Sequence, residues 1–399
     1  MSETSIARDA APESGVLRSA LPPTHRYLLF APIAIGGSAA IHLGRQIGDA
    51  GFTRTLAIKR LRDERASDPE LLACLLDEAR IGARIRHANV LVPHDLVFDN
   101  GEVWLVMDYV AGDSLRAVLA ALGRGVPVLP WFAASIVAGV LHGLHAAHEA
   151  VGDDGAPLGL VHRDVSPHNV FVGTDGVARI IDFGVAMARD RVQNTLSGYV
   201  KGKLGYLAPE QLLGEATDRR ADVFGAGAVL WECLAGRRLA DAGSDRACVL
   251  RGKVPAPSRI AGRPETALDA IVLRSLAPDP EDRFESAREM ALAIERAGDV
   301  APASAVGAWI ARLLAPALLR REALVAQAEC ASMQTSWHAR AIVNVARARA
   351  SERPVPLDDE TATGQVTLSR SISGPGVPWI LVASIASAVA AGVAAALLS

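Results

Sequence analysis

The chain has 399 residues, more than one average domain, which predicts two or three structural units. Its 41 Lys and Arg residues nearly balance 44 Asp and Glu residues, for a net charge of −3. There is no basic excess that would favour nucleic-acid binding and no acidic block typical of a solvating tail, so we expect no nucleic-acid partner.

The cysteines and the N-terminus bear on the cellular compartment. Four cysteines are widely spaced and form no C-x-x-C pair: Cys74, Cys233, Cys248 and Cys330. This spacing favours small buried side chains in a reducing compartment over disulfides or metal ligands. The first residues, MSETSIARDAAPESG, contain no apolar signal-peptide core. We therefore expect the body of the protein to stay in the cytoplasm.

The first third of the chain carries mostly strand patterns. Residues 1–26 are polar and aperiodic, which predicts a disordered leader. Strand patterns follow from Tyr27 to about Met107, in the stretches YLLFAPIAI, RTLAIKRL, LVPHDLVF and EVWLVMDYV. The exception is SDPELLACLLDEARIGARI, where Asp68 is a good N-cap and Pro69 occupies the first helical position. This stretch predicts a helix.

Helical patterns dominate after Ser114, as in AASIVAGVLHGLHAAHEA and ADVFGAGAVLWECLAGRR. A small sheet-rich half followed by a larger helical half predicts an α+β architecture with a cleft between the halves. Residues 296–348 continue as amphipathic helices and form a predicted helical extension. Residues 349–377 are rich in Pro, Ser, Thr and Asp, as is typical of a linker.

The C-terminal segment 378–398 has the composition of a transmembrane helix. Trp379 to Leu398 are 20 residues without a charge, which is the length needed to span a bilayer. Its eight Ile, Leu and Val residues contribute a free energy of membrane insertion of about −4 kcal/mol. The Ser and Gly residues make this free energy less favourable. A buried Ala-rich helix would instead show polar residues on one face. Ala388, Gly392 and Ala396 form a small-xxx-small ridge compatible with a homodimer, although Ala-rich sequences give this pattern by chance.

Several short motifs follow one another in a specific order. His162-Arg163-Asp164 is followed five residues later by Asn169, and Asp182-Phe183-Gly184 follows the apolar run VARII. Upstream, Ala57-Ile58-Lys59 ends a strand pattern, and downstream lies Ala208-Pro209-Glu210.

This ordered set of motifs resembles the bacterial, eukaryotic-like Ser/Thr protein kinases. The segments VHRDVSPHN and GKLGYLAPEQ are most similar to the myxobacterial members. The resemblance covers residues 27–295. It implies a two-lobed protein-kinase fold, with a small β-rich N-lobe and a larger helical C-lobe, followed here by the transmembrane helix. It also implies ATP and Mg²⁺ as cofactors and proteins as substrates.

The resemblance assigns roles to the charged and amide residues. Lys59 would hold the α- and β-phosphates, oriented by Glu78 on the predicted helix; the neighbouring Asp77 points about 100° away in a helix. Asp164 would accept or orient the proton of the substrate hydroxyl. Asn169 and Asp182 would bind Mg²⁺, because a hard cation prefers oxygen ligands.

The phosphate loop departs from the family pattern G-x-G-x-x-G-x-V. Ala34 and Ala39 replace the first and third glycines, while Gly36 and Gly37 still allow backbone amides to approach phosphate closely. Ala39 is tolerable if its φ stays negative. The loop residues expected at the nucleotide are Ile35, Gly36, Gly37 and Ser38.

The adenine pocket and the supporting residues follow from the same resemblance. Met107 would be the gatekeeper, and backbone groups of Asp108–Val110 would bind the adenine edge. The expected walls are Ile41 and Ala57 as the roof and Phe171 in the floor. His162 and Phe183 would pack between the lobes, Asp222 would brace the HRD backbone, and Glu210 with Arg283 would form a buried ion pair.

Two features concern regulation and charge. Arg163 before the catalytic aspartate implies a phosphorylated loop, with Thr195 and Ser197 as acceptors, although a loop of solvated polar residues is the alternative.

Most family members carry a lysine two residues after the aspartate, where this chain has Ser166. Lys203 stands where they have a threonine, so we expect the two residue types to be exchanged, against the alternative of an exposed Lys203.

The sequence thus predicts an active, ATP- and Mg²⁺-dependent Ser/Thr kinase, anchored in the cell membrane by a single C-terminal helix with its catalytic domain in the cytoplasm. The contrasting hypothesis is a membrane-tethered pseudokinase scaffold that binds nucleotide without turnover. A small-molecule phosphotransferase is disfavoured by the Ala-Pro-Glu segment.

Overall fold

The computed structural model describes residues 26–36, 39–48, 52–62, 68–99, 102–183, 204–239, 250–298 and 300–332. The predicted linker and transmembrane helix lie outside the described residues. So do Gly37, Ser38, Cys248 and the loop that contains Thr195, Ser197 and Lys203.

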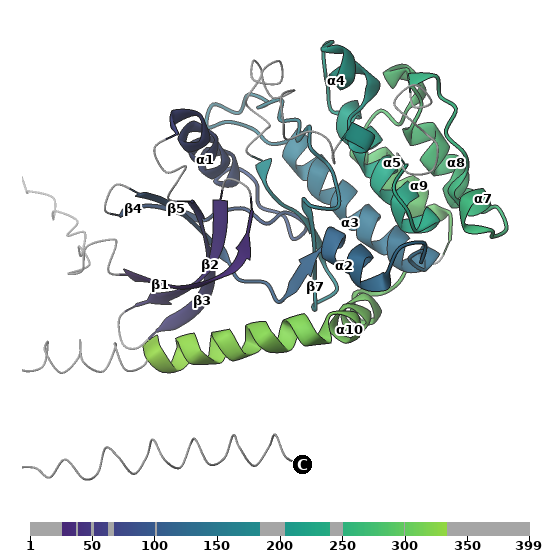
Figure 1. The fold of residues 1–399 in the computed structure, drawn as a ribbon. Coiled ribbons are helices and arrows are strands. Elements are labelled where there is room, and N and C mark those ends of the chain that lie inside the picture. The colour runs from purple at the N-terminus through teal and green to yellow at the C-terminus, as the bar shows by residue number, and fades with distance from the viewer. Residues whose placement is uncertain are drawn as a thin grey trace, which may run out of the picture. The chain divides into compact units, whose positions relative to one another are not determined.

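The N-lobe is a five-stranded antiparallel sheet with one helix on it (Figure 1). The strand order is β1-β2-β3-β5-β4. Its elements are β1 (Tyr27–Ile35), β2 (Ala39–Ile47), β3 (Thr53–Leu61), α1 (Pro69–Gly82), β4 (Asp95–Asp99) and β5 (Glu102–Asp108).

Helix α1 begins where the sequence predicts. The backbone N–H of Leu71 donates to Oδ1 of Asp68 at 3.3 Å, which satisfies one of the first amides of the helix. Leu75 of α1 is buried against Ala57 and Leu105 on one face of the sheet. Alternate residues of the same strands, such as Ile58, pack on the other face. The lobe therefore has two apolar layers, and α1 covers the face that also bears Lys59.

The C-lobe is mainly helical, with a small sheet of order β6-β7-β8 beside it. Its elements are β6 (Gly112–Ser114), α2 (Leu115–Leu122), α3 (Pro130–His148), β7 (Val170–Gly173), β8 (Ala178–Ile180), η6 (Leu204–Tyr206), α4 (Pro209–Leu213), α5 (Arg220–Ala235), α7 (Pro257–Ala261), α8 (Ala267–Ser275), η8 (Pro280–Asp282), α9 (Ala287–Arg296) and α10 (Ala303–Leu313). A further helix, Ala315–Ser332, follows α10.

Two helices form the centre of the C-lobe. Residues 221–235 of α5 are buried along their whole length, so this helix has no solvent face. Among the described residues, α3 is the one single helix with the length and apolar composition of a membrane span, yet 61% of that stretch is buried inside the lobe. Helix α3 is therefore a core helix. Helix α10 and the helix Ala315–Ser332 reach that composition only as a pair, and the pair is bent by 89°. Helix α10 joins the same core through Val306 and Ile310.

The two-lobed α+β architecture is confirmed, with three differences in detail. Ala39–Ile47 forms a strand, although the sequence pattern placed only the phosphate loop and its flank there. The predicted strand LVPHDLVF shortens to Asp95–Asp99, because Pro93 lacks a ladder donor and precedes the paired stretch. Cys330 is exposed rather than buried, since it lies on the outer side of the last helix.

Candidate active site

Lys59 lies near the end of β3 and connects three segments of the chain. Its Nζ donates to Oε2 of Glu78 at 2.6 Å and to Oδ1 of Asp182 at 3.2 Å. Burial acts to lower the pKa of Lys59, but the carboxylates of Asp182 and Glu78 outweigh it and raise the pKa above its ordinary value. The lysine is therefore held as a cation at the junction of the two lobes.

The structure distinguishes the two acidic candidates on α1. Glu78 is 6% exposed and faces Lys59. Asp77 instead pairs with the exposed guanidinium of Arg80 at 3.2 Å. Successive helical residues differ by about 100°, so only one of the two can reach the sheet. The structure thus brings Glu78, and not Asp77, to Lys59.

Asp164 and Asn169 form the polar centre of the loop before β7. Nδ2 of Asn169 donates to the backbone carbonyl oxygen of Asp164 and to its Oδ2, both at 2.8 Å. Asn169 is 6% exposed, so its side-chain amide is held by these protein hydrogen bonds and has little contact with water. The amide thereby orients the carboxylate that would accept a proton from a substrate hydroxyl.

Asp222 at the start of α5 holds the backbone of this loop by hydrogen bonds. Its carboxylate accepts from the backbone N–H groups of His162 at 2.8 Å and Arg163 at 2.7 Å. It also lies 2.8 Å from Nε2 of His148. Burial acts to raise the pKa of Asp222, but the hydrogen bond and charge of His148, with the amide of His162, hold the pKa below its ordinary value. Asp222 is therefore an ionised carboxylate in a buried site.

Arg163 and Asp182 are the only described non-glycine residues with positive φ, at 64° and 67°. This left-handed conformation costs energy for residues with a side chain and is typical of functional sites. The conformation of Arg163 is held by the hydrogen bond from its backbone N–H to the carboxylate of Asp222. Asp182 lies next to Phe183, whose ring packs edge-on against His162 at 4.7 Å between centroids. Nε2 of His162 is 3.0 Å from the carbonyl oxygen of Ile181.

One face of the N-lobe sheet carries the expected adenine roof. Ile41 pairs with Lys59, and Met107 pairs with Ala57, so these side chains share a face by the two-residue period of a strand. Ala57 and Met107 belong to one apolar cluster with Leu105, and Ile41 packs against this cluster.

The hinge that follows β5 runs from Asp108 through Val110 to β6, where Ser114 pairs with Phe171 of β7. The residues predicted for the adenine roof, hinge and floor thus lie on β2, β3, β5 and β7 and on the segment that follows β5.

The phosphate loop is a hairpin between β1 and β2. Ile35 pairs with Ala40, and the N–H of Gly36 donates to the carbonyl oxygen of Ala39 at 2.9 Å. Ala39 keeps a negative φ, since it is not among the positive-φ residues. An alanine is therefore compatible with this turn, and the loop tip, Gly37 and Ser38, lies outside the described residues.

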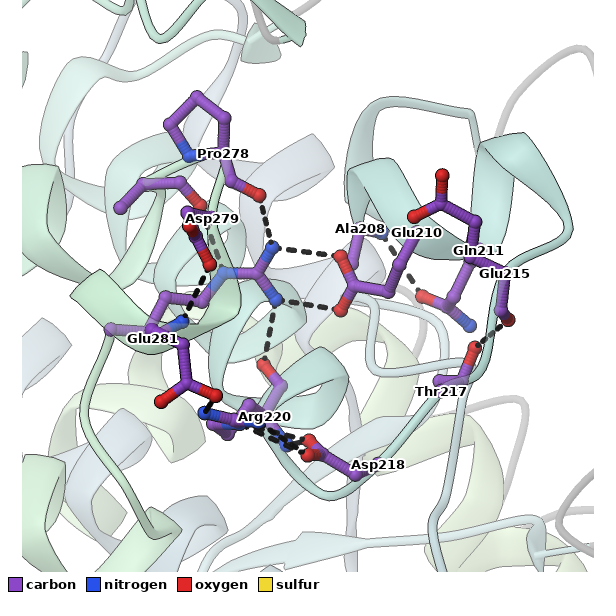
Figure 2. Close-up of polar contacts among 12 residues, drawn as sticks. Ala208, Glu210, Gln211, Glu215, Thr217, Asp218, Arg220, Pro278, Asp279 and Glu281 are labelled. Atoms are coloured by element: carbon purple, nitrogen blue, oxygen red, sulfur yellow. Dashed lines mark hydrogen bonds and ion pairs between the residues drawn. The ribbon is translucent and has the colours of Figure 1, made fainter.

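Glu210 and Arg283 form a buried ion pair at the base of the C-lobe. Nη1 and Nη2 of Arg283 donate to Oε1 and Oε2 of Glu210 at 2.7 and 2.8 Å. The Arg283 side chain is fully buried and also donates to backbone carbonyls of Arg220, Ala277 and Pro278. Figure 2 shows Glu210 facing the loop of Pro278 and Asp279. The segment that begins with Ala208-Pro209-Glu210 is thus tied to the rest of the lobe.

Asn169 and Asp182 are suited to a hard cation. They supply an amide oxygen and a carboxylate, the donor types that Mg²⁺ prefers. Because Nδ2 of Asn169 donates to Asp164, Oδ1 is the amide atom that remains for a metal. Within the described ranges, no group of three or more His, Cys, Asp or Glu side chains could hold a metal by itself. Two protein ligands suffice when waters and substrate phosphates complete the shell.

Two supporting residues are not apparent in the sequence. His148 belongs to the apolar helix α3, and only the fold brings it to Asp222. Gln211 donates from Nε2 to the carbonyl oxygen of Arg163 at 2.9 Å and accepts at Oε1 from the N–H of Ala208 at 3.0 Å. It links the catalytic loop to the Ala-Pro-Glu segment. Its position beside that segment was the one available signal.

A lysine between two carboxylates, an amide-oriented aspartate and an oxygen pair suited to Mg²⁺ define a phosphotransferase-type site between two lobes. The protein kinase domain model matches residues 33–290. The chain belongs to the protein kinase family.

The chain also resembles individual kinases. It is 36% identical over 279 residues to the tyrosine-protein kinase MasK of Myxococcus xanthus, covering 69% of this chain and 43% of MasK. It is 34% identical over 270 residues to the serine/threonine-protein kinase PknH of Mycobacterium tuberculosis, covering 64% of this chain and 41% of PknH. The chain thus spans less than half the length of these curated relatives.

Among solved structures, the PknI kinase domain of Mycobacterium tuberculosis aligns with a TM-score of 0.50 and 26% identity. The alignment covers 68% of this chain and 96% of that domain.

Proposed function

We propose that the chain is an ATP- and Mg²⁺-dependent protein kinase that transfers the γ-phosphate to Ser or Thr hydroxyls of proteins. The observation that carries the proposal is the position of Lys59, in contact with Glu78 and Asp182 at once. Phosphoryl transfer depends on such positioning and on charge neutralisation, because there is little covalent chemistry for the protein to perform.

Each residue has one task in this proposal. ATP and Mg²⁺ supply the phosphoryl group and the charge that neutralises it. Lys59 binds the α- and β-phosphates, Asn169 and Asp182 hold the metal, and Asp164 takes the proton of the acceptor hydroxyl. The apolar roof and the hinge backbone hold the adenine.

Tyrosine is the second candidate acceptor. Two observations favour it: the similarity to MasK, which is named a tyrosine-protein kinase, and the absence of the usual lysine at Ser166. Similarity to PknH, named a serine/threonine-protein kinase, supports the first candidate. The test is to incubate the purified full chain with γ-labelled ATP, Mg²⁺ and a general protein substrate, and to identify the labelled amino acid after hydrolysis. Phosphoserine or phosphothreonine supports the proposal, whereas phosphotyrosine alone replaces it with the second candidate.

An exchange of residue types completes the active site in this proposal. Ser166 is fully buried, and its Oγ has no hydrogen-bond partner among the described residues. Lys203 lies outside that part of the chain. We assign the ammonium that reaches the γ-phosphate to Lys203 and the hydroxyl role to Ser166.

The activation loop is proposed to be autophosphorylated at Thr195, with Ser197 as a second acceptor. The support is Arg163, whose Nε is buried and has no partner among the described residues. A guanidinium in that state is suited to a phosphate, which accepts several charge-assisted hydrogen bonds.

The chain is further proposed to be a single-pass membrane protein with a cytoplasmic kinase domain. The support is compositional: the uncharged stretch from Trp379 to Leu398 has the length of a span. Resistance of the full chain to carbonate extraction from membranes, lost on truncation after residue 377, tests the anchor. Dimerisation through Gly392 predicts that Gly392→Ile lowers self-association in membranes.

A further inference from the structure

The helix Ala315–Ser332 contacts both lobes. It follows α10 after a bend of 89°. In Figure 1 it is the light-green helix that runs from α10 along the strands of the N-lobe. Its first half belongs to the C-lobe core through Leu318, and its last turn reaches β2.

One stripe of this helix faces the protein. Leu318 and Ala328 are 7% and 1% exposed, and Ser332 is fully buried. Residues between them on the opposite side, such as Arg320 and Gln327, are exposed. This spacing is that of an amphipathic helix docked along one side. The helix is therefore packed onto the kinase domain over its described length.

The N-lobe end of the contact is a buried arginine. Arg45 of β2 is 5% exposed, and its guanidinium lies 3.2 Å from Oε1 of Glu329 and 3.4 Å from Oγ of Ser332. It also donates to Oγ1 of Thr55 at 2.5 Å and of Thr53 at 2.7 Å. Glu329 is the carboxylate paired with this guanidinium among the described residues. A buried cation needs such a partner, because desolvation is costly when the charge is unpaired.

The other end of the contact is the hinge. The guanidinium of Arg321 donates to the backbone carbonyl oxygen of Gly112 and, at 2.8 Å, to Oδ2 of Asp113. Gly112 is itself packed so closely on β7 that an added Cβ would lie 2.3 Å from the carbonyl oxygen of Val172. The hinge is thus fixed between β7 and the helix just beyond the adenine-binding residues.

The helix docks on the same face of the sheet that holds the nucleotide residues. Thr55, Ala57 and Lys59 alternate along β3, so their side chains lie on one face. Thr55 pairs with Arg45 across the ladder, and its Oγ1 is 3.4 Å from Oε1 of Glu329. The docked helix therefore continues the surface that begins with the phosphate lysine and the adenine roof.

We infer that the Ala315–Ser332 helix is an interlobe brace that sets the position of the hinge, and that Arg321 and the Arg45–Glu329 pair are positioning residues for nucleotide binding. The brace ties β6 to β2 without touching the reacting atoms. Release of either end frees the hinge and the N-lobe sheet relative to the C-lobe. Nucleotide affinity then falls, because the binding-competent arrangement is populated less. The effect on nucleotide rests on the proposed kinase function, whereas the effect on hinge motion does not.

The test compares matched variants of the full chain, purified in mild detergent. Arg321→Ala breaks the hinge contact, and Arg320→Ala changes the exposed neighbour on the same turn. Glu329→Ala breaks the N-lobe contact, and Gln327→Ala is its control. Two measurements are made on each: the affinity for a non-hydrolysable ATP analogue with Mg²⁺, and amide hydrogen exchange over residues 108–113 and β2–β3.

We expect Arg321→Ala and Glu329→Ala to weaken analogue binding about tenfold, with KM for ATP rising and kcat within about twofold, because uniform binding is what is lost. Exchange should speed up at the hinge and in β2–β3 but not in α5. Arg321→Lys should restore part of the affinity.

Equal analogue affinity and equal hydrogen exchange in Arg321→Ala and Arg320→Ala would contradict the proposal that the helix is an interlobe brace. Should Arg321→Ala fail to fold, as loss of α5 protection would reveal, Glu329→Ala decides from the other end. A wild-type chain that binds no nucleotide contradicts the proposed function, and the exchange data still decide the brace.

Discussion

Lys59 and Glu78 are 19 residues apart in the chain, and their side chains meet at 2.6 Å between β3 and α1. The contact requires that α1 lie against the sheet with this face inward. It coexists with the contact from Lys59 to Asp182, so the N-lobe, its helix and the segment after β8 are aligned together. In kinases the lysine–glutamate pair must be in place for transfer.

The first prediction concerns this pair. Glu78→Gln removes the charge that orients Lys59, so kcat/KM for ATP should fall about 10²-fold, as for other misplaced catalytic groups. Steady-state kinetics measure the effect. Asp77→Asn, one residue away and paired with exposed Arg80, is the control and should stay within about twofold of wild type. Equal losses in the two variants would contradict the assignment.

The second prediction concerns the buried pair Glu210–Arg283. Glu210→Gln leaves the fully buried guanidinium without its carboxylate, so the free energy of unfolding should fall by about 3–5 kcal/mol. Urea unfolding followed by circular dichroism measures it. Glu215→Gln changes an exposed carboxylate five residues later and should shift the free energy by less than about 0.5 kcal/mol. A loss below about 1 kcal/mol for Glu210→Gln would show that the pair contributes little.

The third prediction concerns pH. Because the pKa of Asp222 is lower in the folded chain than the ordinary value near 3.9, the carboxylate adds stability above that value. The contribution is lost as the pH falls through the lowered folded-state pKa. Asp222→Asn should cost about 1.5–3 kcal/mol at pH 7 and flatten the stability profile below about pH 5. Unfolding series between pH 3 and pH 7 test this, and parallel profiles for variant and wild type would refute it.

The fourth prediction concerns Lys203 and Ser166. If the residue types are exchanged, Lys203→Ala should lower kcat by about 10²–10³-fold, because a charge that stabilises the transferred phosphoryl group is removed. The double variant Ser166→Lys/Lys203→Thr should recover most of the rate. Full turnover by Lys203→Ala rules out the exchange.

The fifth prediction concerns the loop acceptors. If the loop is regulated as proposed, Thr195→Ala/Ser197→Ala should lower activity and remove the corresponding phosphopeptide, because Arg163 would lose the phosphate that orders the loop. Mass spectrometry and kinetics check the two effects. Unchanged activity together with an unchanged phosphopeptide map would reject the regulation.

Much of the fold follows from local signals in the sequence. The cap at Asp68 and the leucine stripe fix where α1 begins and which side is apolar. The choice of Glu78 over Asp77 follows from helical geometry, once Lys59 is taken as the partner. These features depend on neighbours within a few residues, which is why patterns reveal them.

The remaining features depend on contacts between distant segments. Nothing local distinguishes Arg45 in β2 from an exposed strand arginine, and only the fold buries it against Glu329. The stripe of the last helix indicates that one side is covered, but not by which lobe. His148 likewise gains its role only when α3 packs against α5.

The most direct test of the central claim is phosphate transfer by the full chain compared with Asp164→Asn. Both proteins should bind the ATP analogue equally, since Asp164 does not hold the nucleotide in this account. Transfer from γ-labelled ATP should fall about 10²–10⁴-fold in the variant, as expected for loss of a general base. Two results would contradict the account, provided that both proteins bind nucleotide. The first is no phosphate transfer by the wild type, which would favour a scaffold without turnover. The second is equal transfer by the wild type and Asp164→Asn.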